Sequence, residues 1–295
     1  MYFAGIDIGG STIKMCVMDE NGVLHHEGAI PTITGDPQAL ADSVVEAFAR
    51  VGLPYCALGV STAGRVNRET NLVIASNLKW MRVPFAAIMA DTARCPVAID
   101  NDVAGALYGE WSVGACQNAR CVAYVALGTG VGGAFLIDGK PFRGFDNTGG
   151  EIGHMITHAD GLPCLCGGHG CFEQYASATA LAHMGGRAPE EIFRLAAQGD
   201  AAMNRVLDDY AHELSIGLAN IAALIRPEMI VLGGGIAQAG EPLLSRVRDE
   251  LRLRCPSMPT QTPPPVVAAR LGNRAGMIGG AMMARNLWHG MQSSR

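Results

Sequence analysis

Two stretches of the chain repeat one pattern: an apolar strand, a turn of Gly with Ser or Thr, and a second apolar strand. The first reads "YFAGIDIGGSTIKMCVMDENG" (residues 2–22), and the second reads "CVAYVALGTGVGGAFLIDGK" (residues 121–140). Each stretch ends in a hairpin signal, ENG or IDG. The repetition predicts two similar halves, each of which begins with a pair of strands around a tight turn.

Helical patterns lie between and after the two repeats. In residues 35–52, Asp36 can cap a helix, Pro37 suits its first turn, and Gly52 lies past its end. The other expected elements are strands within residues 55–64, 95–102 and 228–235 and helices within residues 199–227, 240–255 and 275–290. Strands that alternate with helices indicate the α/β class.

The chain is long enough for two halves that each bury a core. It has 295 residues, of which 49% are hydrophobic and 17% are charged. We expect the boundary near residues 111–119, with a first domain over residues 1–112 and a second over residues 113–279.

Charge and hydropathy exclude several classes of partner. The net charge of −5 and the lack of a Lys or Arg run argue against nucleic-acid binding. The start, "MYFAGIDIGG", lacks the regions of a signal peptide, and no apolar run is long enough to cross a bilayer, so no membrane partner is expected. Six of the nine cysteines are scattered and are expected to be reduced and inert, which predicts a cytoplasmic location.

The two Gly turns can each form an anion site, because consecutive backbone N–H groups in a tight turn make a concave, positively polarised surface. They are "DIGGST" (residues 7–12) and "LGTGVGG" (residues 127–133), and neither matches the P-loop or the Rossmann pattern. Together they could hold a polyphosphate, and Asp7 could hold Mg²⁺ through water. Two ordinary hairpin turns are the alternative. A third cluster, "LGGGIAQ" (residues 232–238), could seat a nucleoside.

Asn101 and Asp102 follow an apolar strand, where α/β folds place much of their chemistry. A kinase of small hydroxyl compounds needs one carboxylate that accepts the hydroxyl proton during phosphoryl transfer. Asp102 is the candidate for this base, and a turn or a helix cap is the alternative for the dipeptide.

A cluster of three cysteines lies in a segment rich in Gly and Pro, at Cys164, Cys166 and Cys171. One histidine would complete a tetrahedral Cys₃His zinc site, which would leave no open position and would therefore be structural. Spacing alone does not choose among the three nearby histidines, His154, His158 and His169. A set of reduced core thiols is the alternative.

Two glutamates, Glu151 and Glu173, flank this cluster. A carboxylate accepts two hydrogen bonds from vicinal hydroxyls, which suits a sugar. Each glutamate could instead be a surface acid. A metal-braced loop would hold both at set distances.

These motifs together resemble the ROK family of repressors, open reading frames and kinases. The resemblance rests on "DIGGSTIK", "DND", "GTGVGG", "GGEIGHM" and "CLCGGHGCFEQYAS", in this order from residue 4 to beyond residue 236. It implies an actin-like, ribonuclease-H-like fold of two duplicated α/β domains around a central cleft, with a C-terminal helix over about residues 280–295 that returns to the first domain. It also implies ATP-dependent phosphorylation of a hexose, Mg²⁺, a structural Zn²⁺ and a homodimer.

The resemblance assigns roles residue by residue. Asp102 becomes the catalytic base, and His154 becomes the fourth zinc ligand beside the three cysteines. The sugar contacts become Gly64, Arg65, Asn77, Asn101, Asp102, Glu151, His154 and Glu173. The nucleotide contacts become Asp7, Gly9, Gly10, Ser11, Thr12, Lys14, Gly128, Thr129, Gly130, Gly132, Gly133, Gly233, Gly234 and Gly235. The expected reaction is in-line transfer of the γ-phosphate to a sugar hydroxyl, at C6.

Other readings remain open from the sequence. "STAGRVN" (residues 61–67) looks like the corresponding turn in N-acetylmannosamine kinases, whereas "SNLKW" (residues 76–80) is close to a segment of glucokinases, and glucose is favoured slightly. A sugar-sensing regulator would carry a DNA-binding segment ahead of the first turn, and Asp7 leaves no room for one. A zinc hydrolase would need an open metal position.

Overall fold

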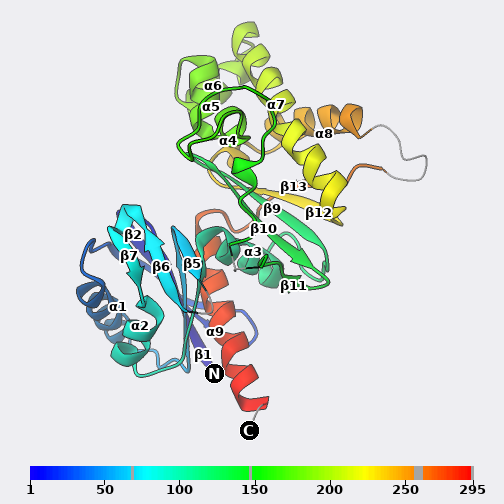
Figure 1. Ribbon diagram of the computed structural model, residues 1–295. Helices are drawn as coiled ribbons and strands as arrows, with labels where there is room; N and C mark the ends of the chain where they lie inside the picture. Colours follow the sequence, from blue (N-terminus) through cyan, green and yellow to red (C-terminus); the bar gives the residue numbers. More distant parts are fainter. Residues whose placement is uncertain (68–69, 146–147, 256–261, 294–295) are drawn as a thin grey trace. The chain divides into compact units, whose positions relative to one another are not determined.

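The computed structural model describes residues 1–67, 70–145, 148–255 and 262–293. The chain forms two compact units (Figure 1). Unit 1 contains Met1–Asn118, Arg143–Gly149 and Asn273–Arg295, and unit 2 contains Ala119–Phe142 and Gly150–Gly272. The chain thus passes from unit 2 to unit 1 at Arg143 and returns at Gly150.

This division differs in detail from the expected one. The first boundary lies after Asn118, which is within the expected range of residues 111–119 but later than the domain end at residue 112, because the chain stays with unit 1 through the turns that follow the helix α3 (Asp102–Val113). The C-terminal part of unit 1 begins at Asn273 rather than near residue 280, because the whole helix α9 (Ala275–Ser293), which the sequence pattern placed from residue 275, belongs to unit 1. The short return of Arg143–Gly149 to unit 1 has no local signal in the sequence.

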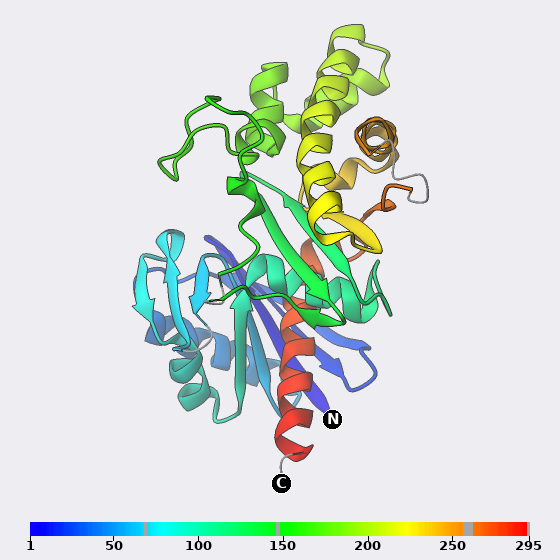
Figure 2. The same cartoon turned by 45° about the vertical axis from the view of Figure 1, so that its right-hand side comes forward.

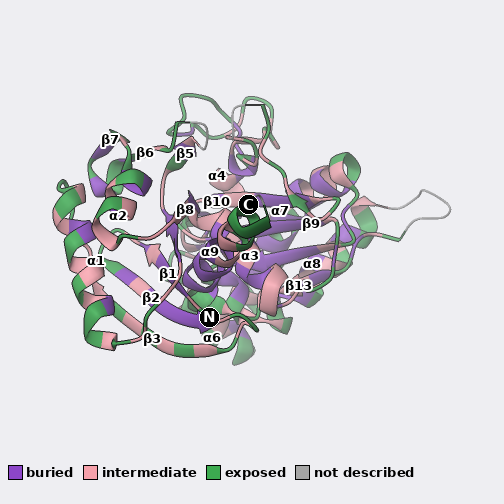
Figure 3. Ribbon diagram, turned by 90° about the horizontal axis from the view of Figure 1, so that it is seen from below, coloured by how far each residue is buried: buried purple, intermediate pink, exposed green. Residues whose placement is uncertain are grey.

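Unit 1 is built on a five-stranded sheet with the order β3-β2-β1-β4-β8. The strands are β1 (Tyr2–Ile8), β2 (Thr12–Asp19), β3 (Leu24–Pro31), β4 (Leu58–Thr62) and β8 (Val97–Asn101). The first three are antiparallel, and β4 and β8 run parallel to β1. Most residues of β1 and β2 are buried (Figure 3).

Helices cover both faces of this sheet. Alternate residues of β1, including Ile6 and Ile8, pack in a core with α1 (Pro37–Val51) and α2 (Phe85–Ala93). The residues between them face α9, which also packs on α3 and is drawn in red along the sheet in Figures 1 and 2. A small second sheet is formed by β5 (Arg65–Asn67), β6 (Leu72–Ala75) and β7 (Trp80–Val83), with the short 3-10 helix η1 (Ser76–Leu78) between the last two.

Unit 2 repeats the topology with the strand order β11-β10-β9-β12-β13. The strands are β9 (Val122–Leu127), β10 (Val131–Ile137), β11 (Lys140–Pro141), β12 (Met229–Gly233) and β13 (Val266–Ala268). The helices are η2 (Ile152–His154), α4 (Glu173–Ala176), α5 (Ala178–Gly185), α6 (Pro189–Ala197), α7 (Ala201–Ile225), η3 (Ile236–Ala239) and α8 (Glu241–Arg254), and η4 (Gly272–Arg274) leads back to unit 1. Residues of β9 and β12 share one apolar core with α7 and α8. In both units an antiparallel hairpin is extended by two parallel strands, so the repeat seen in the sequence is a repeat of structure.

Local signals placed several elements correctly. The Asp36 side chain accepts the N–H of Ala39 at 2.9 Å and caps α1, and Gly52 ends this helix in the left-handed conformation with φ 73°. Asp200 caps α7 in the same way. No helix in the described part of the chain combines the length and the apolar composition that crossing a membrane would need.

Glycines let α9 approach its neighbours at backbone contact. A Cβ on Gly5 would lie 2.0 Å from the carbonyl oxygen of Met277, and a Cβ on Gly59 would lie 1.8 Å from that of Gly280. A Cβ on Gly279 would lie 1.7 Å from the carbonyl oxygen of Gly105 in α3. Backbone oxygens cannot move aside as a flexible side chain can, so these positions admit only glycine.

We expect Gly279→Ala to lower the free energy of unfolding by about 1–3 kcal/mol or more, because the new methyl group overpacks a contact between two backbones. Gly290→Ala in the same helix is the matched control: a Cβ there meets nothing within 4 Å. Removal of a helical glycine should stabilise that variant by up to about 1 kcal/mol. Thermal unfolding of both variants measures the difference, and equal melting temperatures would contradict the packing argument.

Candidate active site and metal centre

The carboxyl ends of three parallel strands in unit 1 carry a row of polar side chains. The register aligns Asp7 of β1 with Ser61 of β4 and Ser61 with Asp100 of β8. The next row ends in Asn101, and Asp102 follows as the first residue of α3. Catalytic groups in α/β folds usually lie at this edge of the sheet. The sheet therefore places Asp7 and Asp102, which are far apart in the sequence, at the same edge.

Burial raises the pKa of both Asp7 and Asp102. Burial raises the pKa of Asp7 to about 6, the negative charge of Asp102 adds to this, and Lys14 opposes it. Burial also raises the pKa of Asp102, although hydrogen bonds, chiefly from the backbone N–H of Val103, oppose the shift. Gly276 of α9 contributes to this burial, since a Cβ there would lie 2.5 Å from the Asp7 carboxyl carbon. Two partly buried carboxylates at one place are suited to a cation and to a proton transfer.

The first Gly turn is held from behind by Thr32, a residue that the sequence reasoning missed. The Thr32 hydroxyl donates to the carbonyl oxygen of Gly9 at 2.8 Å, and its backbone N–H donates to that of Ser11 at 3.0 Å. Gly10, Ser11 and Thr12 are exposed. The hydrogen bonds from Thr32 thus fix the backbone of the turn while its residues 10–12 stay accessible to solvent, as an anion site requires.

The predicted sugar contacts of unit 1 lie in three short segments. Asn101 caps α3 by accepting the Val103 N–H at 2.9 Å, and its side-chain amide donates to the carbonyl oxygen of Gly64 at 2.8 Å. Gly64 has φ 99°, and a Cβ there would lie 2.3 Å from the carbonyl oxygen of Ile74, so this turn needs glycine. Asn77 is exposed and lies beside the first Gly turn, 3.6 Å from where a Cβ on Gly10 would be. Arg65 is also exposed.

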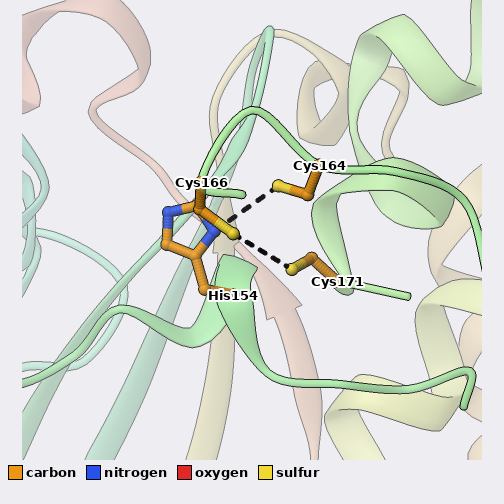
Figure 4. A group of neighbouring side chains, drawn as sticks. All are labelled: His154, Cys164, Cys166 and Cys171. Carbon is orange, nitrogen blue, oxygen red and sulfur yellow. Dashed lines mark hydrogen bonds between the residues drawn. The ribbon is translucent and has the colours of Figure 1, made fainter. Parts of the chain in front are cut away.

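In unit 2, His154 and the three clustered cysteines converge (Figure 4). All four ligand atoms lie within 4.8 Å of one another. The Cys166 and Cys171 sulfurs are 3.6 Å apart, and the Cys164 sulfur is 3.8 Å from His154 Nδ1. Their parent segments are held by the bridges Ile156↔Cys171 and Pro163↔His169.

This geometry fits a tetrahedral zinc ion. Bonds of about 2.0–2.3 Å to sulfur and nitrogen hold the ligand atoms of a tetrahedron roughly 3.5–3.8 Å apart. His158 is turned elsewhere: its ring stacks on Tyr175 with centroids 4.0 Å apart, and its Nε2 lies 3.4 Å from Glu213. His169 is exposed and stands outside the group. The fold therefore brings His154, rather than either alternative, to the cysteines.

Glu173 connects this cluster to the second Gly turn. One of its oxygens accepts a hydrogen bond from the Cys164 thiol at 3.2 Å, and the other would lie 2.7 Å from a Cβ on Gly130. The turn is also tied to the start of α5: Ala178 N–H donates to the Gly128 oxygen at 2.7 Å, and the Thr179 hydroxyl donates to the Thr129 oxygen at 2.9 Å. Glu151, by contrast, is exposed and precedes η2.

The remaining predicted nucleotide contacts divide into two groups. Gly234 has φ 82° and packs against the backbone of Leu127, so the third Gly cluster adjoins the second Gly turn, and Gly235 faces open space. Gly132 and Gly133 lie within β10, where a Cβ on Gly133 would lie 2.6 Å from Ile152. The packing of β10 accounts for Gly133, and its contact with a nucleotide stays a prediction.

Comparisons with known proteins agree with this architecture. A sequence model of the ROK family matches residues 3–287. The chain is 34% identical to a glucokinase of Streptomyces coelicolor, over 95% of this chain and 96% of the relative. It is 31% identical to an N-acetyl-D-glucosamine kinase of Shigella boydii, over 96% and 99%.

A solved structure of similar fold is that of a ROK family glucokinase from Streptomyces griseus in complex with glucose and AMPPNP. It has a TM-score of 0.84 and 31% identity, and the match covers 97% of this chain and 100% of that one. The predicted actin-like, duplicated α/β class is confirmed. The chain belongs to the ROK family.

Proposed function

We propose that this protein is an ATP-dependent hexose kinase. The observation that carries this conclusion is the convergence of Asp7, the first Gly turn and Asp102 at one edge of the unit 1 sheet. Kinase chemistry needs a cation site, a phosphate cradle and one carboxylate base, and this edge offers all three. The relatives described above are sugar kinases by name and match this chain over nearly their whole length.

Asp102 acts as the base. Its carboxylate accepts the proton of the sugar hydroxyl as the hydroxyl oxygen attacks the γ-phosphorus and the bond to the bridging oxygen of ADP breaks. A raised pKa makes this carboxylate a better proton acceptor than an exposed aspartate, because the best base has a pKa closer to the working pH. Its place at the start of α3, with Asn101 as the cap, fixes the direction of the carboxylate.

The groups around the phosphates neutralise charge. Asp7 would hold Mg²⁺ through water, and the ion would offset the negative charge of Asp102 that helps to raise the pKa of Asp7. The N–H groups and hydroxyls of the first Gly turn would bind phosphate oxygens, and nucleotide contacts of the second and third Gly clusters stay predictions from the family motif.

The Cys₃His group would hold a structural Zn²⁺. The ion, when bound, supplies a cross-link between η2 and the loop that carries the cysteines, and no step of phosphoryl transfer passes through it. Support comes from the distances among the four ligand atoms. Sugar contacts by Glu151, His154 and Glu173 remain predictions from the family motif.

Glucose is the favoured substrate, with phosphorylation at the C6 hydroxyl. Glucokinases are among the relatives that resemble this chain over most of its length, and an N-acetylglucosamine kinase supports an N-acetylated hexosamine, such as N-acetylglucosamine or N-acetylmannosamine, as the second candidate. None of the nine cysteines, all of which lie in the described part of the chain, forms a disulfide, which supports an enzyme of a reducing compartment such as the cytoplasm. A homodimer stays a prediction from the family.

We expect ADP release with ATP and Mg²⁺ when glucose, N-acetylglucosamine, N-acetylmannosamine, allose and mannose are supplied in turn, with the highest kcat/KM for glucose.

Asp102→Asn should lower kcat by at least about 10²-fold, because the general base is lost, while calorimetry still detects sugar binding. The matched control is Asp138→Asn, which changes an exposed acid with 82% of its side chain accessible and should leave turnover unchanged. Near-normal turnover in Asp102→Asn would contradict the assignment of the base.

Asp7 should make the protein less stable at neutral pH. Its pKa rises from 3.8 unfolded to about 6 folded, so its stabilising contribution is complete below 3.8 and is lost as the pH rises through about 6. Without Mg²⁺ or nucleotide, Asp7→Asn should therefore have a free energy of unfolding that is higher than that of the wild type at pH 8 by up to about 3 kcal/mol. It should unfold at a correspondingly higher temperature.

This advantage of Asp7→Asn should shrink as the pH falls below 6, and the variant should be inactive. Asp42→Asn, at an exposed position of α1, is the control and should shift neither curve. A variant that is less stable than the wild type at pH 8 would show that the Asp7 carboxylate is favourably paired.

Removal of the metal should lower the stability of unit 2 without removing a catalytic group. We expect one equivalent of zinc in the purified protein by elemental analysis, and none in Cys171→Ser, which should also unfold at lower temperature. Cys255→Ser, a half-buried thiol outside the cluster, should keep its zinc. A zinc-free wild type of full stability would refute the structural metal.

A further inference from the structure

A buried ion pair joins Asp100, the residue before the Asn101-Asp102 dipeptide, to Arg143. One guanidinium nitrogen of Arg143 contacts the Asp100 carboxylate, and the two side chains are only 17% and 4% exposed. A buried pair of this kind rarely adds net stability, because both charges lose their hydration. Its presence beside the proposed base therefore calls for another reason.

Asp100 also connects Arg143 to the site through hydrogen bonds. Its other oxygen accepts the backbone N–H of Asn101 at 2.9 Å, and the Asn101 side chain donates in turn to the carbonyl oxygen of Gly64 at 2.8 Å. The same Asn101 side chain caps α3 through the N–H of Val103. A continuous chain of contacts thus runs from Arg143 through Asp100 and Asn101 to the turn at Gly64.

The backbone of Arg143 makes a second contact, with Gly149. Its carbonyl oxygen accepts the N–H of Gly149 at 2.9 Å, which closes the ends of the segment Arg143–Gly149 on each other. This segment belongs to unit 1, although the chain on both sides of it belongs to unit 2. Among the described residues, Arg143 Nε and Nη2 are buried without a hydrogen bond of good geometry, and the contact of Nη2 with the Asp100 carboxylate is an ion pair.

We propose that Arg143 is a positioning residue for phosphoryl transfer. Through Asp100 it fixes the backbone where β8 ends and α3 begins, and so sets where the Asn101 amide and the Asp102 carboxylate meet the sugar hydroxyl. This inference rests on the proposed kinase function. Small displacements at such a point have large effects on rate, because the reacting atoms must stay close and aligned.

Steady-state kinetics on the preferred sugar test the proposal in three variants. Arg143→Met should lower kcat/KM for the sugar by about 10- to 100-fold while KM for ATP stays within about two-fold. Arg143→Lys keeps the charge and should recover part of the loss. Arg50→Met, the same replacement in an exposed pair with Glu46 on α1, is the matched control and should behave as wild type.

Because Arg143→Met leaves a carboxylate buried without its partner and could unfold the protein, the decisive variant is Asp100→Asn/Arg143→Met. It removes both charges, and the asparagine oxygen still accepts the Asn101 N–H. We expect its melting temperature to return close to that of the wild type while kcat/KM for the sugar stays low.

Wild-type kcat/KM in the double variant, or a parallel rise of KM for sugar and ATP, would overturn the positioning role and leave the pair a structural one. A wild-type protein that phosphorylates no sugar would overturn the proposed function, and this inference with it. An active wild type with a fully active double variant would overturn only the inference.

Discussion

The close approach of α9 to the unit 1 sheet is the constraint on which the site depends. Backbone contacts at Gly5, Gly59 and Gly279 set the distance between this helix and its neighbours. At that distance Gly276 covers Asp7, and the carbonyl oxygen of Gly276 accepts the Ser61 hydroxyl at 2.8 Å. A helix with larger residues would stand further off, Asp7 would be hydrated, and the carboxyl would lose the raised pKa that follows from its burial.

The parts of the fold that short segments specify were predictable from the sequence. Asp36 and Gly52 delimit α1 because a capping carboxylate and a left-handed glycine act within one helical turn. The duplicated strand–turn–strand pattern predicted the first hairpin of each unit, since each hairpin needs only its own turn and its own apolar strands. The Cys₃ cluster was visible for the same reason: its residues are close in sequence.

Features made by distant residues were not predictable in this way. The spacing of the cysteines could not choose between His154 and His158, because the choice depends on the stacking of His158 on Tyr175 and on its approach to Glu213 in α7. Thr32 bonds to the first Gly turn only because β3 lies beside β2. Most of the residue roles came from the family motif, which contains neither Thr32 nor Arg143 and gives Asp100 no role of its own.

The edge of the unit 1 sheet gathers features that oppose stability. Asp7 and Asp102 are acids whose charged forms burial disfavours, Asp100 and Arg143 are buried ions, and Gly64 holds a turn that other residues would strain. The apolar cores beside this edge compensate, with Ile6, Ile8 and their neighbours fully buried between the sheet and α1. A protein under selection for stability alone would replace such charges by packed apolar side chains. Their concentration where three parallel strands end is therefore itself an argument that this edge performs the chemistry.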